Sequence, residues 1–419
     1  MKVRKGSIAK LVFSLGLSAG LLVLASCGNG GGSSTNTNPP PVSNTQPMEV
    51  NLGPANNYTN GLFTDVTLCV PGSSSCQTIN NVLVDSGSVG LRILSSQVTL
   101  SLPAITDNSS NGLQECLAFA DGSYLWGAVQ AADVKLAGEK AASVPLQMIN
   151  APNTGLAVPS QCLSSGGANV GTVTALGANG ILGIGNFRQD CGGDCTGASS
   201  QVPALYYLCP NTVCQVASVP LAFQLQNPVW LFPQDNNGVL ISLPSIPADG
   251  APTVSGSLIF GIGTQSNNGL GTARIYTTDA FGNFQTTFNN IAYSQSFIDS
   301  GSNGFYFLDA QTLGIPDCSD LPGFYCPAST VNSTATNTGL NGTTAQVSFS
   351  IANADALFSA NSGSNAAFND LGGDNPGGFD WGMPFFFGRN VFVGIEGQTG
   401  PNGVVGPYWA YGPGGASIN

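Results

Sequence analysis

The sequence contains one seven-residue motif twice, DSGSVGL at residues 85–91 and DSGSNGF at residues 299–305. Each copy follows an apolar pair, Leu83-Val84 in the first and Phe297-Ile298 in the second. Asp, Ser and Gly are all favoured in turns, so two unrelated turns are one explanation of the repeat. The other explanation is that two halves of the molecule each contribute one carboxylate to a shared site.

The repeat extends beyond the motif itself. Two apolar residues and a Gly follow each copy, at Ile181-Leu182-Gly183 and at Phe386-Phe387-Gly388. The Gly lies 98 residues after Asp85 in one half and 89 residues after Asp299 in the other. Similar spacings indicate two units of similar size.

In this arrangement the chain resembles the pepsin-like aspartic peptidases. Each of their two lobes carries an apolar-Asp-(Thr/Ser)-Gly-(Ser/Thr) motif and a later apolar-apolar-Gly segment that passes beside it. Two further segments match in order: FADGSYLWGAVQAADVKLAG from Phe119 resembles the hairpin flap, and GSLIFGIG from Gly256 resembles the strand that opens the second lobe. The resemblance implies a mainly β, two-lobed fold with pseudo-twofold duplicated lobes. We expect an N-terminal β lobe at 48–225 and a C-terminal β lobe at 226–419.

Local patterns favour the same fold class. Short apolar runs bounded by turn residues predict strands within residues 80–85, 238–243, 256–261 and 345–351. Helical periodicity is weak and local, at residues 202–208 and 308–314. Residues 327–378 are rich in Asn, Ser, Thr, Ala and Gly, and predict long surface loops.

The resemblance implies that Asp85 and Asp299 form a catalytic pair. Two carboxylates a few ångströms apart cannot both ionise cheaply, so they share a proton. One would take a proton from a water while the other donates to the scissile carbonyl, with no metal or organic cofactor.

The rest of each motif would support its carboxylate. In each loop the first Ser would exchange hydrogen bonds across the lobe junction, the Gly would allow a close approach, and the second Ser would donate to the carboxylate. These supporting residues are Ser86, Gly87, Ser88, Ser300, Gly301 and Ser302.

The flap region departs from the family pattern at two positions. Phe119 stands where these peptidases carry a Tyr, and Arg92 stands where a Trp packs beside it. Arg92 would pair with an acidic group or a substrate carboxylate, or else be a solvated surface residue. The predicted flap turn continues through Asp121, Gly122, Ser123 and Tyr124, and Tyr124 is the hydroxyl that could replace the missing one.

Composition excludes several chemistries. The chain has no His, which removes Ser-His-Asp and Cys-His nucleophile systems. Four of its 10 Lys and Arg lie within residues 1–10, which leaves 6 against 22 acidic residues. Nucleic acid is therefore a poor partner. The resemblance to the peptidases implies a polypeptide substrate or ligand.

The N-terminus predicts export. Basic residues, the run LVFSLGLSAGLLVLAS and Cys27 indicate a signal peptide at 1–26. Leu24-Ala25-Ser26-Cys27 resembles a bacterial lipobox, which implies a lipid-anchored Cys27, a flexible tether at 27–47 and a place in the cell envelope. Gly28 in place of an acidic residue points to the outer membrane. An ordinary signal peptide with an incidental Cys is the alternative, and no later stretch is long and apolar enough to span a bilayer.

Ten cysteines remain after Cys27, an even number suited to an oxidising compartment. Four close pairs can each close a short loop, which leaves one long-range bridge. We predict Cys69–Cys76, Cys191–Cys195, Cys209–Cys214, Cys318–Cys326 and Cys116–Cys162. A zinc site is the alternative, but the chain has no CxxC spacing and no His.

Three functions are consistent with these patterns. The first is a lipid-anchored, monomeric envelope aspartic endopeptidase with a paired-carboxylate mechanism. The second is a catalytically inactive pepsin-fold module that binds peptides or proteins. The third is a structural surface protein, in which the DSG repeats would be merely ancestral.

Overall fold

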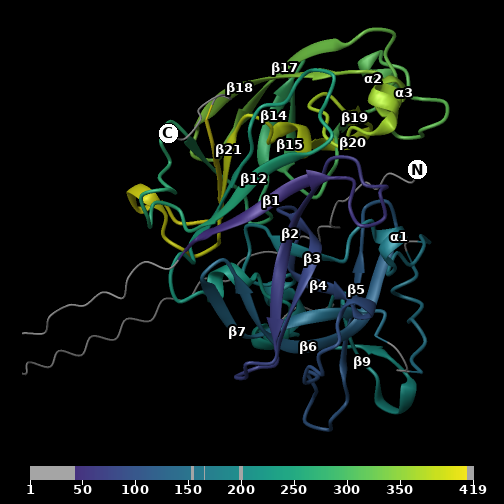
Figure 1. The fold of residues 1–419 in the computed structure, drawn as a ribbon, viewed down its shortest axis with the longest axis vertical. Helices are drawn as coiled ribbons and strands as arrows, with labels where there is room; N and C mark the ends of the chain where they lie inside the picture. Colours follow the sequence, from purple (N-terminus) through teal and green to yellow (C-terminus); the bar gives the residue numbers. More distant parts are fainter. Residues whose placement is uncertain (1–42, 152–154, 165, 198–201, 413–419) are drawn as a thin grey trace, which may run out of the picture.

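The computed structural model describes residues 43–151, 155–164, 166–197 and 202–412. The predicted signal peptide, Cys27 and most of the predicted tether lie outside these residues. The fold is mainly β and two-lobed, as predicted, with the first lobe below and the second above in Figure 1. Among the described residues, no helix is long and apolar enough to cross a membrane.

The first lobe is a sheet built around the predicted flap hairpin. Its strands are β2 (Gly61–Cys69), β3 (Cys76–Asp85), β4 (Val89–Leu94), β5 (Leu113–Ala118), β6 (Tyr124–Leu136), β7 (Glu139–Ile149), β8 (Gly180–Ile184), β9 (Tyr206–Leu208) and β10 (Gln215–Val216). Residues 202–208, where we expected weak helix, contain strand β9 instead, because Tyr206 and Tyr207 pair with β5.

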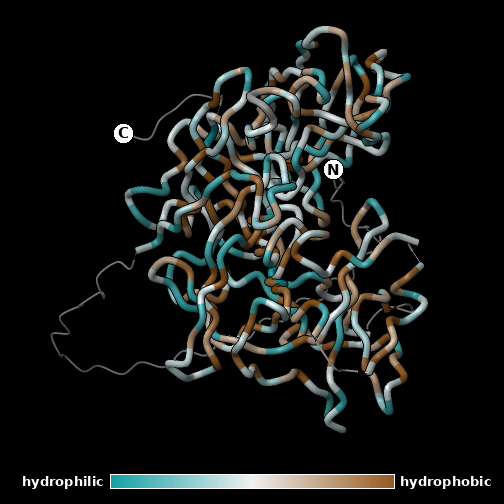
Figure 2. Tube along the Cα trace, turned by 45° about the vertical axis from the view of Figure 1, so that its right-hand side comes forward, coloured by the Kyte–Doolittle hydropathy of each residue, from teal (hydrophilic) through white to brown (hydrophobic). Residues whose placement is uncertain are grey.

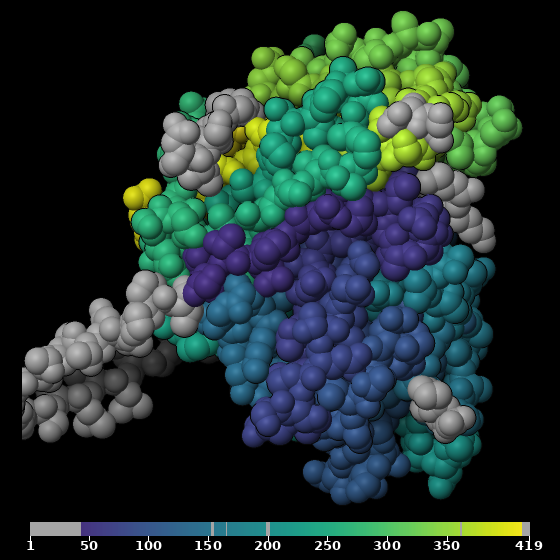
Figure 3. Space-filling model, viewed as in Figure 1, coloured from purple at the N-terminus to yellow at the C-terminus, as the bar shows by residue number. Residues whose placement is uncertain are grey.

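A run of strands joins the lobes. Its members are β1 (Thr45–Asn51), β11 (Gly238–Ser242), β12 (Val254–Phe260), β13 (Arg274–Thr277), β21 (Asn390–Gly394) and β22 (Tyr408–Tyr411). β1 begins three residues before the expected start of the folded part at Met48, and it pairs with β2 on one side and β12 on the other. Figure 3 shows this N-terminal segment as a purple band between the two lobes.

The second lobe has a separate sheet. Its strands are β14 (Phe284–Phe288), β15 (Ile291–Ile298), β16 (Phe305–Leu308), β17 (Val331–Thr338), β18 (Thr344–Ile351), β19 (Gly372–Gly373) and β20 (Asn375–Trp381). The expectation of loops throughout 327–378 is wrong, because β17 and β18 form a regular antiparallel hairpin within it. Their polar Thr, Ser and Asn side chains alternate with buried ones, which hides a strand from a composition argument.

Helical segments are short and lie between strands. The α-helices are α1 (Val173–Leu176), α2 (Ala310–Leu313) and α3 (Ala354–Ser359). The 3₁₀ turns are η1 (Ser95–Gln97), η2 (Gly192–Thr196), η3 (Pro210–Thr212), η4 (Leu221–Phe223), η5 (Pro228–Leu231), η6 (Ala360–Gly363), η7 (Met383–Phe385) and η8 (Pro401–Gly403). Figure 2 shows apolar segments running through the interior of both lobes.

The two lobes repeat one strand arrangement around the DSG motifs. In the first lobe β8 lies parallel to β3 and antiparallel to β4, which in turn lies parallel to β7. In the second lobe β20 lies parallel to β15 and antiparallel to β16, which lies parallel to β19. The matching residues Leu91 and Phe305, the last of each motif, take equivalent places in these ladders. The sequence repeat is therefore a structural repeat.

All five predicted disulfides are present: Cys69–Cys76, Cys116–Cys162, Cys191–Cys195, Cys209–Cys214 and Cys318–Cys326. Cys318 and Cys326 also lie near Asp355, but their sulfurs are bonded to one another and not available as thiolate ligands. The zinc alternative is thus wrong for these pairs. Five bridges mark an extracellular or envelope protein.

Candidate active site

The two motif carboxyls meet at the junction of the lobes. Asp85 ends β3 and Asp299 directly follows β15, with exposed fractions of 8% and 4%. The backbone N–H of Gly87 donates to Oδ1 of Asp85 at 2.9 Å and to Oδ1 of Asp299 at 3.1 Å. The side chains of Asp85 and Asp299 also hydrogen-bond to one another. Burial, and then the neighbouring Asp85, raise the pKa of Asp299 well above its ordinary value.

The motif glycines are required by this close approach. A Cβ placed on Gly87 would lie 2.5 Å from Cγ of Asp299, and one on Gly301 would lie 2.6 Å from Oδ1 of Asp85. No side chain fits at either position without separating the two carboxyls. The N–H of Gly301 donates to Oδ1 of Asp299 at 2.7 Å, in the way Gly87 serves Asp85.

The first Ser of each motif crosses to the other lobe. The N–H of Ser86 donates to Oγ of Ser300 at 3.0 Å, and the N–H of Ser300 donates to Oγ of Ser86 at 2.9 Å. Each hydroxyl then donates onward, Ser86 to the carbonyl of Ile298 and Ser300 to that of Val84. The four bonds lie in the interior, and they fix the two loops relative to one another.

The second Ser of each motif contacts its carboxyl as expected. Oγ of Ser88 donates to Oδ2 of Asp85 at 2.5 Å. Oγ of Ser302 lies 2.9 Å from Oδ2 of Asp299, and it also lies 2.5 Å from Oδ2 of Asp380. Asp380 was not predicted from the sequence.

Asp380 lies where the sequence repeat placed an apolar residue. Gly183 pairs with Asp85 across β8 and β3, and the equivalent register in the second lobe sets Trp381 opposite Ile298. The segment beside Asp299 is therefore Asp380-Trp381-Gly382. The prediction of Phe386-Phe387-Gly388 is wrong: those residues follow η7 and lead into β21. Asp380 occupies the position equivalent to Ile181, so the segment 380–382 lacks the apolar-apolar-Gly pattern of residues 181–183.

The hairpin of β5 and β6 carries Phe119 at its turn, as expected for a flap. Phe119 is partly buried against an apolar cluster that includes Leu83 and Leu117. Oδ1 of Asp121 accepts from the N–H and the hydroxyl of Ser123, and Gly122 adopts a φ of 81° that favours glycine. These contacts shape the turn itself.

Tyr124 does not replace the missing flap hydroxyl. It packs with Cys116, Trp126 and Tyr207, whereas Phe119 packs in a different cluster on the other face of the hairpin. Tyr124 is the cross-strand partner of Ala118, and Phe119 follows Ala118 in the chain, so the phenol lies on the opposite face from Phe119 and the apolar cluster around Leu83. The sequence-based substitution is therefore wrong.

Arg92 is buried and paired with acids. Of the three interpretations of this residue, pairing with an acidic group is the one that the structure supports. Its exposed fraction is 1%, so it is not a solvated surface residue. Nη2 lies 2.5 Å from Oε1 of Glu115 and 3.1 Å from Oδ2 of Asp190, and Nη1 donates to the carbonyl of Val89. With both acids engaged inside the protein, Arg92 is not available to a substrate carboxylate.

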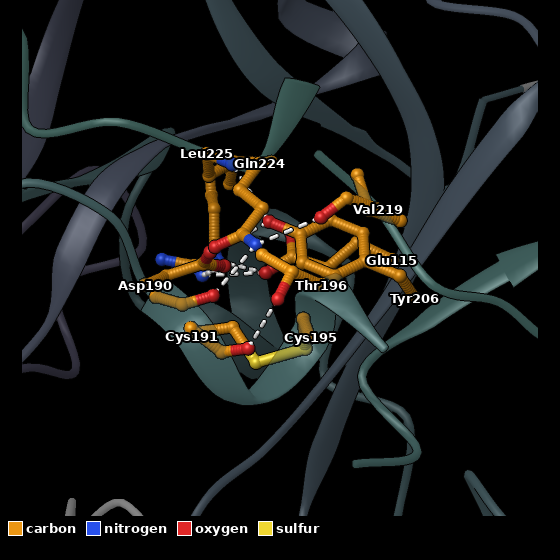
Figure 4. Close-up of a disulfide and its surroundings, with 12 residues drawn as sticks. Glu115, Asp190, Cys191, Cys195, Thr196, Tyr206, Val219, Gln224 and Leu225 are labelled. Carbon is orange, nitrogen blue, oxygen red and sulfur yellow. Dashed lines mark hydrogen bonds and ion pairs between the residues drawn. A yellow bond between two sulfur atoms is a disulfide. The ribbon is translucent and has the colours of Figure 1, made fainter. Parts of the chain in front are cut away.

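The acids around Arg92 form a closed network beside the Cys191–Cys195 disulfide (Figure 4). The hydroxyl of Tyr206 donates to Oδ1 of Asp190 at 2.6 Å and accepts from the N–H of Leu225. Burial, and then the charge of Glu115, raise the pKa of Asp190 well above its ordinary value. The network ties β4, which follows the first motif, to the flap strand β5.

Tyr58 and Asn60 are further contributors that the sequence did not reveal. The hydroxyl of Tyr58, in the first lobe, donates to the carbonyl of Gly301 at 2.9 Å. Nδ2 of Asn60 donates to the carbonyls of Asn303 and Phe368. Both residues lie between β1 and β2 in a segment without a distinctive motif, so only the fold brings them to the second DSG loop.

Residues 40–411 match a protein family described as "Protein of unknown function (DUF3443)". The chain belongs to the DUF3443 family. Among curated proteins, none matches this DUF3443 chain in sequence. Among solved structures it is similar to the aspartic proteinase from Irpex lacteus, with 12% sequence identity and a TM-score of 0.51 over 88% of this chain and 97% of that one. At this identity the likeness establishes the fold: this DUF3443 protein has the two-lobed pepsin-like architecture.

Proposed function

We propose that this protein is an envelope aspartic endopeptidase that hydrolyses peptide bonds with a water activated by Asp85 and Asp299. The observation that carries the proposal is the hydrogen-bonded pair of buried carboxyls, held by two loops with the same contacts. Structural turns would not need glycines that place each backbone against the opposite carboxyl.

The pair supplies both roles that peptide hydrolysis needs. Burial, and then the neighbouring Asp85, raise the pKa of Asp299, so Asp299 is the member of the pair that holds the shared proton. Asp85 takes a proton from the attacking water, and Asp299 donates its proton to the carbonyl oxygen of the scissile bond. Ser88 donates to Asp85 and so holds this carboxyl in place.

Cleavage of an unfolded protein or a peptide library between about pH 3 and 8 tests this function. We expect a bell-shaped pH profile that peaks on the acid side, because fully protonated and fully ionised pairs each lack one role. A statine-type inhibitor, which resembles the tetrahedral intermediate, should compete with substrate. Lack of cleavage at every pH, together with no binding of the inhibitor, would contradict the proposal.

A peptide-binding module without activity is the second candidate. The observation that favours it is the flap, where Phe119 has no hydroxyl and Tyr124 faces the other way. In the cleavage experiment this candidate predicts that peptides bind to the protein and remain intact.

We further propose that Cys27 carries lipid and anchors the folded domain to the membrane, with the outer membrane as its destination. The support is the lipobox-like Leu24-Ala25-Ser26-Cys27 and the polar segment that follows. Acyl chains supply membrane affinity in proportion to the number of buried methylene groups, and two chains give stable anchoring.

Cys27→Ala should move the protein from the membrane fraction to the soluble fraction. The acyl chains are the membrane signal that the sequence offers, so their loss should release the domain. Fractionation of cells that express each form, followed by detection of the chain, measures this. Ser33→Ala is the matched control in the same segment, and it should stay with the membrane. A Cys27→Ala protein that partitions like wild type would exclude the anchor.

A further inference from the structure

Asp380 is a third buried carboxyl joined to the catalytic pair. Its exposed fraction is 3%, and it is the Cα partner of Phe297 on β15 and of Tyr306 on β16. Oδ2 of Asp380 lies 2.5 Å from Oγ of Ser302, and the same Oγ lies 2.9 Å from Oδ2 of Asp299. One hydroxyl thus bridges two carboxyls.

The bridge constrains where protons can be. A Ser hydroxyl has one hydrogen to donate, so Ser302 cannot donate to two ionised carboxylates at once. If Asp380 is protonated, it donates to Ser302 and Ser302 donates to Asp299. If Asp380 is ionised, it competes with Asp299 for the single hydrogen. The state of Asp380 therefore changes the hydrogen bonding of Asp299.

Among the described residues, no cation compensates the charge of Asp380. Within the same residues, Oδ1 of Asp380 is buried and has no hydrogen-bond partner. The ion pairs within the described parts of the chain belong to Arg92 and Lys140, and none includes this carboxyl. The titratable groups that face it are Asp85, Asp299 and Tyr306. Tyr306 donates to Asn303, and burial raises its pKa well above the ordinary value, so it stays neutral.

We propose that Asp380 is a positioning residue that acts through Ser302 and by its charge to keep Asp299 protonated to higher pH. This inference rests on the proposed function, because it deepens the account of the same site. A second negative charge beside Asp299 makes loss of the last proton harder. Three coupled carboxyls then keep the last proton of the pair on Asp299 over a wider pH range than two.

The charges of the three carboxyls act on one another. Burial raises the pKa of Asp380 well above its ordinary value, the Ser302 hydrogen bond opposes this, and the charge of Asp85 adds to it. After burial, the charges of Asp85 and Asp380 both raise the pKa of Asp299. A negative Asp380 therefore makes the last proton of the pair harder to remove, and the alkaline limb of activity reports the loss of that proton.

Asp380→Asn tests the proposal, because an amide can still donate to Ser302 but never becomes negative. The alkaline limb of the cleavage profile should move to lower pH by about one to two units, while the acid limb stays in place. Asp370→Asn is the matched control: Asp370 is also buried in the second lobe, burial raises its pKa to about 6, and no acidic neighbour contributes. Its substitution should leave both limbs unchanged.

Carboxyl ¹³C NMR titration of Asp-labelled protein separates this proposal from the proposed function, because it needs no turnover. Asp299, assigned with Asp299→Asn, should lose its proton at lower pH in Asp380→Asn than in wild type. In the wild-type chain, Asp380 should lose its proton at lower pH than the last proton of the pair. This comparison uses the wild-type chain alone, so it can be made even if the variant does not fold. If the protein is inactive but shows these shifts, the proposed peptidase function is wrong and the proposed effect of Asp380 on Asp299 is supported. An unmoved Asp299, an equal shift in Asp370→Asn, or an Asp380 that stays protonated throughout would overturn the inference.

Discussion

Asp85→Asn and Asp299→Asn should each reduce peptide cleavage by roughly 10⁴-fold or more, because a paired-carboxylate mechanism stops when either role is lost. The double variant should be little worse than either single one, since the two residues act as a unit. The loss should appear in kcat with a smaller change in KM, because an amide keeps the size of the carboxyl and its contacts with the loop. Initial rates on a peptide found in the library assay measure these effects at the wild-type optimum.

Two controls separate chemistry from folding in this experiment. Asp370→Asn removes a buried carboxyl of the second lobe that has no contact with the pair, and it should retain activity. Circular dichroism should show that both catalytic variants keep the β fold. Cleavage that persists in Asp85→Asn and Asp299→Asn would mean that a contaminating protease or another site is responsible.

Local chemistry is the part of the site that the sequence reveals. Asp85 and Asp299 are identified because the turn that holds each one needs a small motif, whose Ser and Gly are visible in the chain. The four short disulfide loops are predictable for a similar reason, since residues four to eight positions apart are close in any compact fold.

Contacts between distant segments are the part that the sequence conceals. Asp380 reaches Ser302 through the register of β15 with β20, 78 positions away in the chain. No sequence pattern near either residue predicts this contact. The acidic side chain of Asp380 also interrupts the apolar pattern that identified Gly183 in the first lobe. The direction of Tyr124 depends on the start of β6, and strand boundaries are among the least predictable features of a sequence.

The network around Arg92 joins two strands of the first lobe through buried charges. Arg92 on β4 contacts Glu115 on β5 by an ion pair, and Nη1 also donates to the carbonyl of Val89, four residues after Asp85. A charged link thus connects the strand that follows the first motif to the flap strand.

Arg92→Met should lower the free energy of unfolding by about 3–5 kcal/mol, because it leaves Glu115 and Asp190 buried without their cation. Methionine keeps much of the volume of the side chain, so the loss measures mainly the charge and its hydrogen bonds. Lys140→Met is the matched control: Lys140 pairs with Asp133 at 2.6 Å in the same lobe, but its exposed fraction is 45%. Its removal should cost about 0–1 kcal/mol, since water can solvate the acid and the N–H groups of Gly72 and Ser143 still donate to it.

The loss in Arg92→Met should also depend on pH and on Glu115. Burial favours the protonated carboxyl, so acids without a cation have a folded-state pKa above the unfolded value. The contribution of these protonated acids to the free energy of unfolding is fully present below about pH 4, and it is lost as pH rises through their folded-state pKa. The variant is therefore least stable near neutral pH. Arg92→Met combined with Glu115→Gln should regain part of the stability, because a neutral amide leaves one buried acid, Asp190, in place of two. Urea unfolding with the disulfides intact, followed by tryptophan fluorescence at pH 4.5 and 7.5, measures each step. A cost for Arg92→Met no greater than that for Lys140→Met would show that the guanidinium is not what holds β4 to the flap strand.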